Sequence, residues 1–383
     1  MSVEQGSAQQ PGPDVGGAFS GLAAELVTLF ARGVDQPLDD AAFLTWALRI
    51  FAHQTEANGT YRAFCEGRGV TPGKVEAWEE IPAVPATAFK YLDLVSGDGA
   101  VEATFRTSGT TGGHGERGRH LVPSLALYRA SLLPNLQAAL LPEAERIPLL
   151  SLIPPPDAVP DSSLSTMIGA AADTLCDGAV WLVDADGRLD VDGFLRTATA
   201  MRREGRPVLV AGTAFAFVHL LDDLAARAAR AHLPEGTRIM ETGGFKGRSR
   251  ILERGALYGA IQDRLGVPEH RVVNEYGMTE LLSQLYEPVL REGPGSERRH
   301  VPPPWLRVRA LDPTTLKQVP PGEPGLLAFF DLANAGSVCH ILTEDIGTVT
   351  ADGVRLRGRV DGAEPRGCSR AMEELVSAGS ARS

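Results

Sequence analysis

The chain is 383 residues long, with 43% hydrophobic residues, 22% charged residues and a formal net charge of -11. This composition predicts a globular protein of one large domain or two, and the acidic balance excludes a broad basic surface for nucleic acid or anionic membranes. No apolar run approaches the length of a membrane span. The first residues lack the basic start and apolar core of a signal peptide, so we expect residues 1–17 to be a disordered tail of a cytoplasmic protein.

The cysteines show neither C-x-x-C pairing nor metal-ligand spacing with histidine, so neither a zinc site nor a disulfide framework is expected. Cys65, Cys176 and Cys339 lie in apolar helix or strand patterns, which predicts that they are buried. Lysine is scarce in this chain. The two lysines that fall inside candidate motifs, Lys90 and Lys246, therefore become candidates for a functional role.

The first part of the chain is predicted to be mainly helical, because apolar residues recur there with helical spacing. The predicted elements up to residue 141 are helices over 18–32, 39–57 and 121–141, an irregular proline-punctuated segment over 81–90 and a strand over 101–106.

Short apolar runs then alternate with helical stretches. Strands are predicted over 147–153, 179–183, 207–210, 238–241 and 271–274. Helices are predicted between them, over 163–175, 191–203, 215–232 and 248–265. Strict alternation is typical of βαβ units, so we predict an α/β fold with a mainly parallel sheet and helices on both of its faces. Ligands of such sheets bind at the carboxyl ends of the strands.

From residue 305 onward the pattern changes to short strands joined by proline and glycine turns. They cover 306–310, 326–330, 338–342 and 354–357. We therefore divide the chain into a main domain over 18–357, with a small β-subdomain over about 305–357, and a short C-terminal segment over 358–383. Gly367 and the apparent lack of a helical apolar pattern favour a mobile segment around Cys368.

A run of hydroxyls and glycines, Thr107-Ser108-Gly109-Thr110-Thr111-Gly112, follows the predicted strand at 101–106. Glycines allow backbone N–H groups to turn inward, and hydroxyls add donors, so such a loop is suited to phosphate oxygens. The loop lacks the lysine of the P-loop pattern, which argues against γ-phosphoryl transfer. An ordinary polar turn is the alternative, and the ATP-site hypothesis depends on the motifs that follow.

Two further motifs follow predicted strands. In Thr242-Gly243-Gly244-Phe245-Lys246-Gly247, the glycines permit close approach to a flat ligand such as adenine, and Lys246 is a candidate partner for phosphate or carboxylate. The second motif is Asn274-Glu275-Tyr276-Gly277-Met278-Thr279-Glu280, which offers an aromatic face, a hydroxyl and a carboxylate. A carboxylate near ATP usually holds Mg²⁺. Taken alone, each motif also fits the turn that starts a helix.

Two polar residues near the end of the β-rich part complete the set. Asp345 ends a predicted strand and is a candidate acceptor for ribose hydroxyls, although a β-turn aspartate would look the same. Arg359, in Gly358-Arg359-Val360-Asp361, is a candidate partner for ribose or phosphate.

These motifs, in this order, resemble the adenylate-forming superfamily of acyl-CoA synthetases, peptide-synthetase adenylation domains and luciferases. The resemblance implies ATP and Mg²⁺ as cofactors and the fold of the large N-terminal domain of that superfamily. It implies that the loop from Thr107 to Gly112 contacts phosphates. It places Tyr276 on adenine, Thr279 on phosphate, Glu280 on Mg²⁺ and Asp345 on ribose, with Gly277 in the same motif and Arg359 leading into a hinge.

The chain departs from the superfamily at its end. Superfamily members normally add a C-terminal lid domain with a catalytic lysine, but no lysine follows Arg359. We therefore expect the lid to be missing or reduced to a short tail. If a lysine assists adenylation, Lys246 or Lys90 must take its place.

A narrower resemblance is to LuxE-type acyl-protein synthetases, and it runs from about Leu22 to the C-terminus. It rests on the segments 49–61, 81–90, 107–112, 242–246 and 366–369. Members of that family activate a fatty acid as its acyl-adenylate and take the acyl group onto a cysteine near their C-terminus, which matches Cys368. They then pass it to an acyl-CoA-reductase-like partner that makes the aldehyde. Arg366 and Arg370 flank Cys368 and would favour its thiolate.

Two other functions stay open from the sequence. One is a phenylacetate-CoA ligase-like enzyme that passes the acyl group to coenzyme A or an amine. The other is a non-catalytic nucleotide-binding subunit that supports a reductase, which the joint presence of the hydroxyl loop, Glu280, Asp345 and Arg359 argues against.

Overall fold

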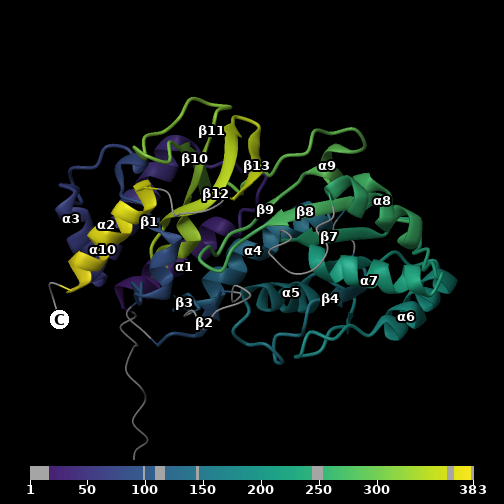
Figure 1. The fold of residues 1–383 in the computed structure, drawn as a ribbon. Coiled ribbons are helices and arrows are strands. Elements are labelled where there is room, and N and C mark those ends of the chain that lie inside the picture. Colours follow the sequence, from purple (N-terminus) through teal and green to yellow (C-terminus); the bar gives the residue numbers. More distant parts are fainter. Residues whose placement is uncertain are drawn as a thin grey trace, which may run out of the picture.

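Two sheets of different construction lie side by side, and helices flank both (Figure 1). The computed structural model describes residues 17–97, 100–107, 117–143, 146–243, 253–359 and 366–380. The predicted tail lies almost wholly outside these residues. No helix in the described part of the chain is both long enough and apolar enough to cross a membrane.

The larger sheet has six strands in the order β5-β4-β6-β7-β8-β9, all parallel except β9, which pairs antiparallel with β8. Its strands are β4 (Leu149–Leu152), β5 (Ala179–Trp181), β6 (Leu209–Thr213), β7 (Arg238–Thr242), β8 (Val272–Tyr276) and β9 (Leu285–Tyr286). The central strands are buried along most of their length, as parallel strands covered on both faces must be.

Helices cover both faces of this sheet, which confirms the predicted α/β class. On one face, side chains such as Leu150 and Val210 pack with α6 (Val191–Glu204), α7 (Ala214–Ala226) and α8 (Arg254–Leu265). On the other face, their sequence neighbours Leu149 and Leu209 belong to the core that contains α4 (Leu125–Leu140) and α5 (Ser163–Thr174). Successive side chains of a strand point to opposite faces, so one apolar run serves both layers.

The second sheet is mainly antiparallel and contains the predicted β-rich part. It consists of β10 (Leu306–Leu311), β11 (Pro324–Asp331), β12 (His340–Thr350) and β13 (Gly353–Arg359). A fifth strand, β1 (Val84–Pro85), pairs parallel with β12. The segment predicted to be irregular thus supplies this strand and the 3₁₀ helix η2 (Ala86–Lys90).

The N-terminal helices and a hairpin join the two sheets. The helices are α1 (Ala18–Phe30), α2 (Asp40–Ala57) and α3 (Gly59–Gly67), and the hairpin pairs β2 (Ala103–Arg106) with β3 (Arg119–Val122). Short elements complete the chain: the 3₁₀ helices η1 (Trp78–Glu80), η3 (Glu269–Arg271) and η4 (Leu332–Gly336), and α9 (Val289–Glu292).

Two predicted helices are shorter than expected, for identifiable reasons. The prediction that a helix begins at residue 121 was wrong, because β3 runs to Val122 and the Ser124 hydroxyl caps α4 by accepting from the Leu127 N–H at 3.2 Å. The helix predicted over 215–232 ends at Ala226, since Ala228 and His232 adopt positive φ angles of 51° and 42° that a right-handed helix does not allow.

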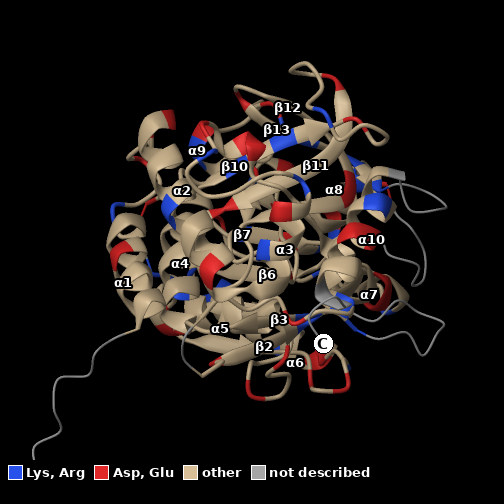
Figure 2. Cartoon of the chain, turned by 90° about the vertical axis from the view of Figure 1, so that its left-hand side faces the viewer, with Lys and Arg blue, Asp and Glu red and all other residues tan. Residues whose placement is uncertain are grey.

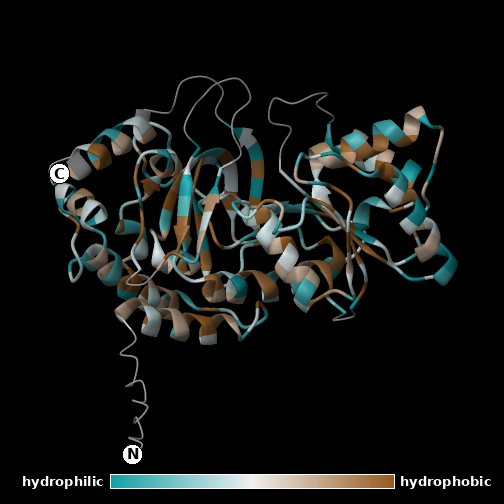
Figure 3. Ribbon diagram, turned by 90° about the horizontal axis from the view of Figure 1, so that it is seen from below, coloured by the Kyte–Doolittle hydropathy of each residue, from teal (hydrophilic) through white to brown (hydrophobic). Residues whose placement is uncertain are grey.

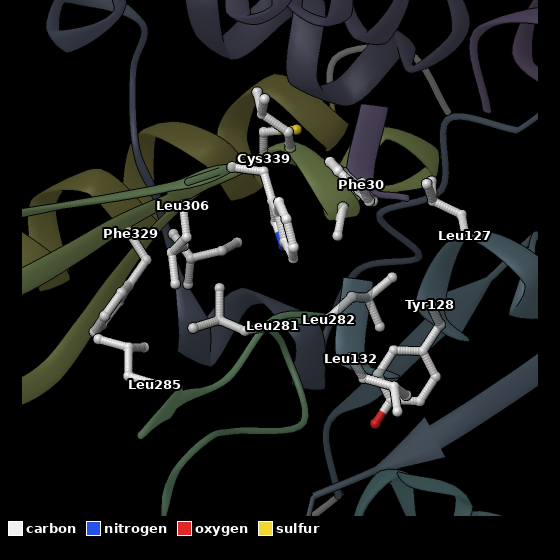
Figure 4. Close-up of a cluster of buried hydrophobic side chains, with 14 of the residues drawn as sticks. Phe30, Leu127, Tyr128, Leu132, Leu281, Leu282, Leu285, Leu306, Phe329 and Cys339 are labelled. Carbon is white, nitrogen blue, oxygen red and sulfur yellow. The ribbon is translucent and has the colours of Figure 1, made fainter. Parts of the chain in front are cut away.

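One hydrophobic core runs beneath both sheets and fixes their mutual position. Figure 4 shows side chains of α1, α4, β10 and β11 meeting those of Leu281 and Leu282, which follow β8. Phe30 packs on Trp305 with ring centroids 4.7 Å apart. Seen from below, hydrophobic residues lie on strands of both sheets and on the helices that flank them (Figure 3). Acidic and basic residues are interspersed on the side shown in Figure 2.

The C-terminal segment departs from its prediction. Residues Arg366–Ser380 form a helix, α10, that packs against α3 and β1 at one end of the molecule (Figure 1). Cys368, Ala371 and Leu375 recur with helical spacing, and each is at most 2% exposed. The expectation of a segment without a helical apolar pattern was therefore wrong, because small side chains form most of the buried face of α10.

Candidate active site

Two motif residues from different sheets meet at the end of β8. The Tyr276 hydroxyl donates to Asp345 Oδ2 at 2.7 Å, so the last residue of β8 contacts β12 directly. The Tyr276 ring stacks on Phe329 of β11, with ring centroids 5.5 Å apart. Burial, followed by the nearby Asp345 carboxylate, raises the pKa of Tyr276 well above its usual value, so the phenol remains a donor.

Arg359 joins this pair from β13. The register of the β12–β13 hairpin places Arg359 directly opposite Asp345, and their Nε and Oδ1 atoms are 3.6 Å apart. A second contact joins Arg359 to Glu344 at 3.3 Å. Tyr276, Asp345 and Arg359 therefore form one polar cluster at the carboxyl end of a parallel strand, where ligands of such sheets bind.

The hydroxyl loop connects β2 to β3, and its base is fixed by hydrogen bonds. The Gly118 N–H donates to the Thr107 hydroxyl at 2.9 Å, and the Thr107 N–H donates to the Gly118 carbonyl at 3.0 Å. Thr107 thus closes the base of the hairpin. The other loop residues of the prediction, Ser108, Gly109, Thr110, Thr111 and Gly112, lie outside the described residues.

A buried histidine joins this hairpin to the tyrosine motif. His120 of β3 lies 2.8 Å from the Thr279 carbonyl through Nδ1 and 3.0 Å from the Ser337 hydroxyl through Nε2. A carbonyl only accepts, so Nδ1 carries the proton and Nε2 of the neutral ring accepts from Ser337. Burial lowers the pKa of His120 to about 4. Phe89, which precedes Lys90, packs edge-on against the His120 ring at 5.2 Å and places that lysine beside the hairpin.

This histidine makes stability depend on acid pH. A histidine in the unfolded chain binds a proton near pH 6.5, whereas His120 in the folded chain stays neutral down to about pH 4. The contribution of His120 to the free energy of unfolding is therefore complete above pH 6.5 and is lost as the pH falls toward 4. The loss amounts to about 3 kcal/mol. We expect His120→Gln to be less stable at pH 7 but to show a shallower decline of the free energy of unfolding between pH 6.5 and 4.

Urea unfolding at several pH values measures this slope. The matched control is His219→Gln, because His219 is exposed on α7. Equal slopes for the wild type and His120→Gln would contradict the assignment.

The glycine motif begins beside the tyrosine motif, on the neighbouring strand. Gly243 follows β7 with a φ of +78°, a conformation that favours glycine. The preceding Thr242 lies opposite Glu275 in the sheet and donates its hydroxyl to the Glu275 carboxyl group. A Cβ atom on Gly277 would lie 2.4 Å from the same carboxyl group, so Glu275 occupies the space beneath the Tyr276-Gly277 turn. Burial raises the pKa of Glu275 to about 7.

Glu280 lies at the end of the tyrosine motif and is 8% exposed. Its backbone carbonyl accepts from the Asn334 amide at 2.7 Å, which fixes the segment that carries the carboxylate. Within the described ranges no group of three or more His, Cys, Asp and Glu side chains could hold a metal by itself. Mg²⁺ beside a nucleotide commonly uses one or two carboxylates together with phosphates, and Glu280 fits that smaller demand.

Two predicted residues of the glycine motif, Gly244 and Lys246, lie outside the described residues. The roles assigned to them, like the contacts predicted for Thr279, remain predictions.

Cys368 lies on the other face of the antiparallel sheet from this cluster. It packs with Leu326 and Ala328 of β11, whereas Leu327 and Phe329, between and beyond them, face the core that includes Tyr276. Since successive strand residues point to opposite faces, the sheet separates the Cys368 thiol from Asp345. The remaining cysteines, Cys65, Cys176 and Cys339, are buried as predicted.

Several residues that shape the site were not singled out from the sequence. The Asp331 carboxylate accepts from the N–H groups of Leu282 and Ser283 at 3.1 and 2.8 Å, and so holds the segment after Glu280 in place. His120 holds Thr279 in place by donating its Nδ1–H to the Thr279 carbonyl. Neither residue lies near its partner in the sequence, so no local pattern could have identified these contacts.

Comparison with known proteins gives a family match over most of the chain. The model of the family described as acyl-protein synthetase, LuxE, matches residues 34–377. Two relatives are named long-chain-fatty-acid–luciferin-component ligase. The Vibrio harveyi protein is 25% identical over 337 residues, covering 84% of each chain. The Aliivibrio fischeri protein is 26% identical over 302 residues, covering 76% of this chain and 75% of the relative.

Solved structures show the fold. A 2-hydroxyisobutyryl-CoA ligase in an open conformation, in complex with 2-HIB-AMP and CoA, has a TM-score of 0.62 at 15% identity and covers 84% of this chain and 70% of its own. ATP-bound MatB from Rhodopseudomonas palustris has a TM-score of 0.47 at 17% identity, and the match spans 68% of this chain and 49% of MatB. The likeness to the 2-hydroxyisobutyryl-CoA ligase confirms the predicted fold, and the match to the family model shows that this chain belongs to the LuxE family of acyl-protein synthetases.

Proposed function

We propose that this chain activates a carboxylic acid, with a fatty acid as the expected substrate, at the expense of ATP. A carboxylate oxygen attacks the α-phosphorus of ATP, the bond to the bridging oxygen breaks, and pyrophosphate leaves with its electron pair. The acyl-adenylate that forms is a good acyl donor because AMP is a much better leaving group than oxide. The observation that carries this proposal is the convergence of Tyr276, Asp345 and Arg359 at the end of β8.

In this proposal, different residues at the site bind different parts of ATP. Asp345 would accept from ribose hydroxyls, and the Tyr276 ring would lie against adenine beside the Gly243 turn. The loop that starts at Thr107 would surround phosphate oxygens with N–H and hydroxyl donors, with Thr279 added from the side. Glu280 would hold Mg²⁺, which when bound offsets the charge that develops on the phosphates.

We propose that Cys368 is the acyl acceptor in a second step. Its thiolate attacks the carbonyl carbon of the acyl-adenylate, the bond to AMP breaks, and a thioester and AMP result. Because the sheet lies between Cys368 and Asp345, α10 must leave its position for this step. One contact that holds α10 is the ion pair between Arg68 and Glu374, whose Nη2 and Oε2 atoms are 2.6 Å apart.

A partner would complete the sequence of reactions. The names of the two relatives refer to a long-chain fatty acid and a luciferin component. By resemblance to the family, an acyl-CoA-reductase-like protein would take the acyl group from Cys368 and reduce it to the aldehyde.

The position of Cys368 also supports a second candidate, a ligase that uses a soluble acceptor such as coenzyme A or an amine. In the structure the thiol is buried on the face of the sheet away from the cluster of Tyr276, Asp345 and Arg359, which we call the nucleotide cluster. A soluble acceptor would need no movement of α10.

One experiment tests both candidates. The protein is incubated with Mg-ATP and a panel of carboxylic acids, pyrophosphate release is measured, and the intact mass is determined before and after neutral hydroxylamine. We expect pyrophosphate release and a hydroxylamine-labile adduct whose mass equals that of the acyl group and which maps to the peptide of Cys368. Pyrophosphate release without an adduct, but with turnover on added coenzyme A, would favour the second candidate. The absence of pyrophosphate release with every acid would contradict adenylation altogether.

A further inference from the structure

A pocket of about 170 Å³ lies beside the helix that carries Cys368. Its apolar walls include Val70, which follows α3, and Ala83, which precedes β1. Leu311 and Leu342 of the second sheet complete them, together with Leu316 from the loop that follows β10. The pocket is thus on the α10 side of the sheet, away from the nucleotide cluster.

The pocket shares wall residues with the buried cluster that contains Cys368. Leu311 and Leu342, two of its walls, belong to the same buried cluster as Cys368, and Leu316 packs against that cluster. The first turn of α10 lies directly on Leu316, because a Cβ atom on Gly367 would be 2.6 Å from the Leu316 Cδ2 atom. The same leucine side chains therefore line the pocket and pack around the Cys368 thiol.

Four charged residues also line the pocket: Arg68, Glu79, Glu80 and Arg309. Arg309 lines it, and the buried Nε atom of Arg309 has no hydrogen-bond partner among the residues that the structure describes. The Nη1 atom of the same guanidinium donates to the Glu79 carbonyl at 2.8 Å, which holds the group in place. A buried N–H without a partner is costly, but this atom is closed off from solvent, so a group in the pocket reaches it only if neighbouring side chains move.

We propose that this pocket holds the acyl chain after its transfer to Cys368, so that α10 docks with its thioester covered until a partner removes the acyl group. The inference rests on the proposed function, since it requires an acyl group on Cys368. The apolar walls that the pocket shares with the Cys368 cluster suit a hydrocarbon chain. The sheet then separates two sites, one where the acyl group is activated and one where the acyl-enzyme is kept from water.

The test measures how long the loaded acyl-enzyme survives. The full-length protein is loaded with Mg-ATP and a long-chain fatty acid, excess reagents are removed, and the adduct on Cys368 is followed by intact mass in buffer and in neutral hydroxylamine. Val70→Trp and Ala83→Phe fill the pocket, so that the chain cannot enter while α10 is docked. In both variants we expect the adduct to decay about tenfold faster than in the wild type, because water reaches the thioester.

The matched control is Val180→Trp, which adds the same bulk at an exposed position of β5. Thermal melting establishes that each variant is folded, and decay rates are compared per molecule of adduct, so they do not depend on the rate of loading. Decay at the wild-type rate in both pocket variants would overturn the inference while leaving the proposed function intact. Failure of the wild type to form any adduct would overturn the inference together with the role of Cys368 as acyl acceptor, whereas adenylation is tested separately by pyrophosphate release.

Discussion

Replacing Asp345 with alanine is expected to raise the KM for ATP about 100-fold in the pyrophosphate-exchange reaction. The change removes the acceptor for the Tyr276 hydroxyl, the partner of Arg359 and the predicted partner of ribose. Hydrogen bonds to a charged group contribute about 1.5–3 kcal/mol each, so losing those to ribose accounts for a change of this size. Because the acid substrate does not depend on these contacts, its KM should change far less.

Two further variants separate binding from positioning. Tyr276→Phe removes only the hydroxyl that reaches Asp345, so it reports what that contact contributes to holding the ring in place. Asp352→Ala is the matched control, because Asp352 is exposed in the β12–β13 turn and contacts Arg299 through its backbone carbonyl. If Tyr276→Phe raised the KM for ATP as much as Asp345→Ala does, the aspartate would serve mainly to orient the tyrosine. An unchanged KM for ATP in Asp345→Ala would remove it from the nucleotide site.

Replacing Cys368 with alanine is expected to abolish the hydroxylamine-labile acyl adduct and to leave pyrophosphate exchange within about twofold of the wild type, since only the second step needs a thiol. Cys176→Ala is the control, because Cys176 is a buried cysteine outside the candidate motifs, and burial raises the pKa of its thiol to about 11. The adduct should form fully in that control. An adduct that persists in Cys368→Ala would show that another residue accepts the acyl group.

The fold was predictable where the hydrophobic pattern has a clear period. Alternating strands and helices between residues 147 and 274 identified the parallel sheet, since each element there buries a continuous apolar stretch. The pattern did not identify β1, because two residues are too few to show any period. Nor did it identify α10, where Cys368 and Ala371 occupy buried positions that larger apolar residues usually mark.

The candidate site was predictable as a set of motifs but not as an arrangement. Tyr276 and Asp345 were selected separately, and their hydrogen bond depends on the contact between two sheets, which no local spacing encodes. The location of Cys368 shows the same limit from the other side. The arginines that flank Cys368 indicated a reactive thiol from the sequence alone. The face of the sheet on which Cys368 lies depends instead on the alternation along β11 and on the docking of α10.

The parallel pairing of β1 with β12 affects the order in which the chain folds during its synthesis on the ribosome. The six-stranded sheet is encoded by one contiguous stretch, from β4 to β9, and can assemble as soon as that stretch emerges. The other sheet joins Val84 to Ile341 and must wait for nearly the whole chain. Because Tyr276 belongs to the early sheet and Asp345 to the late one, the cluster to which we assign the nucleotide forms only near the end of synthesis.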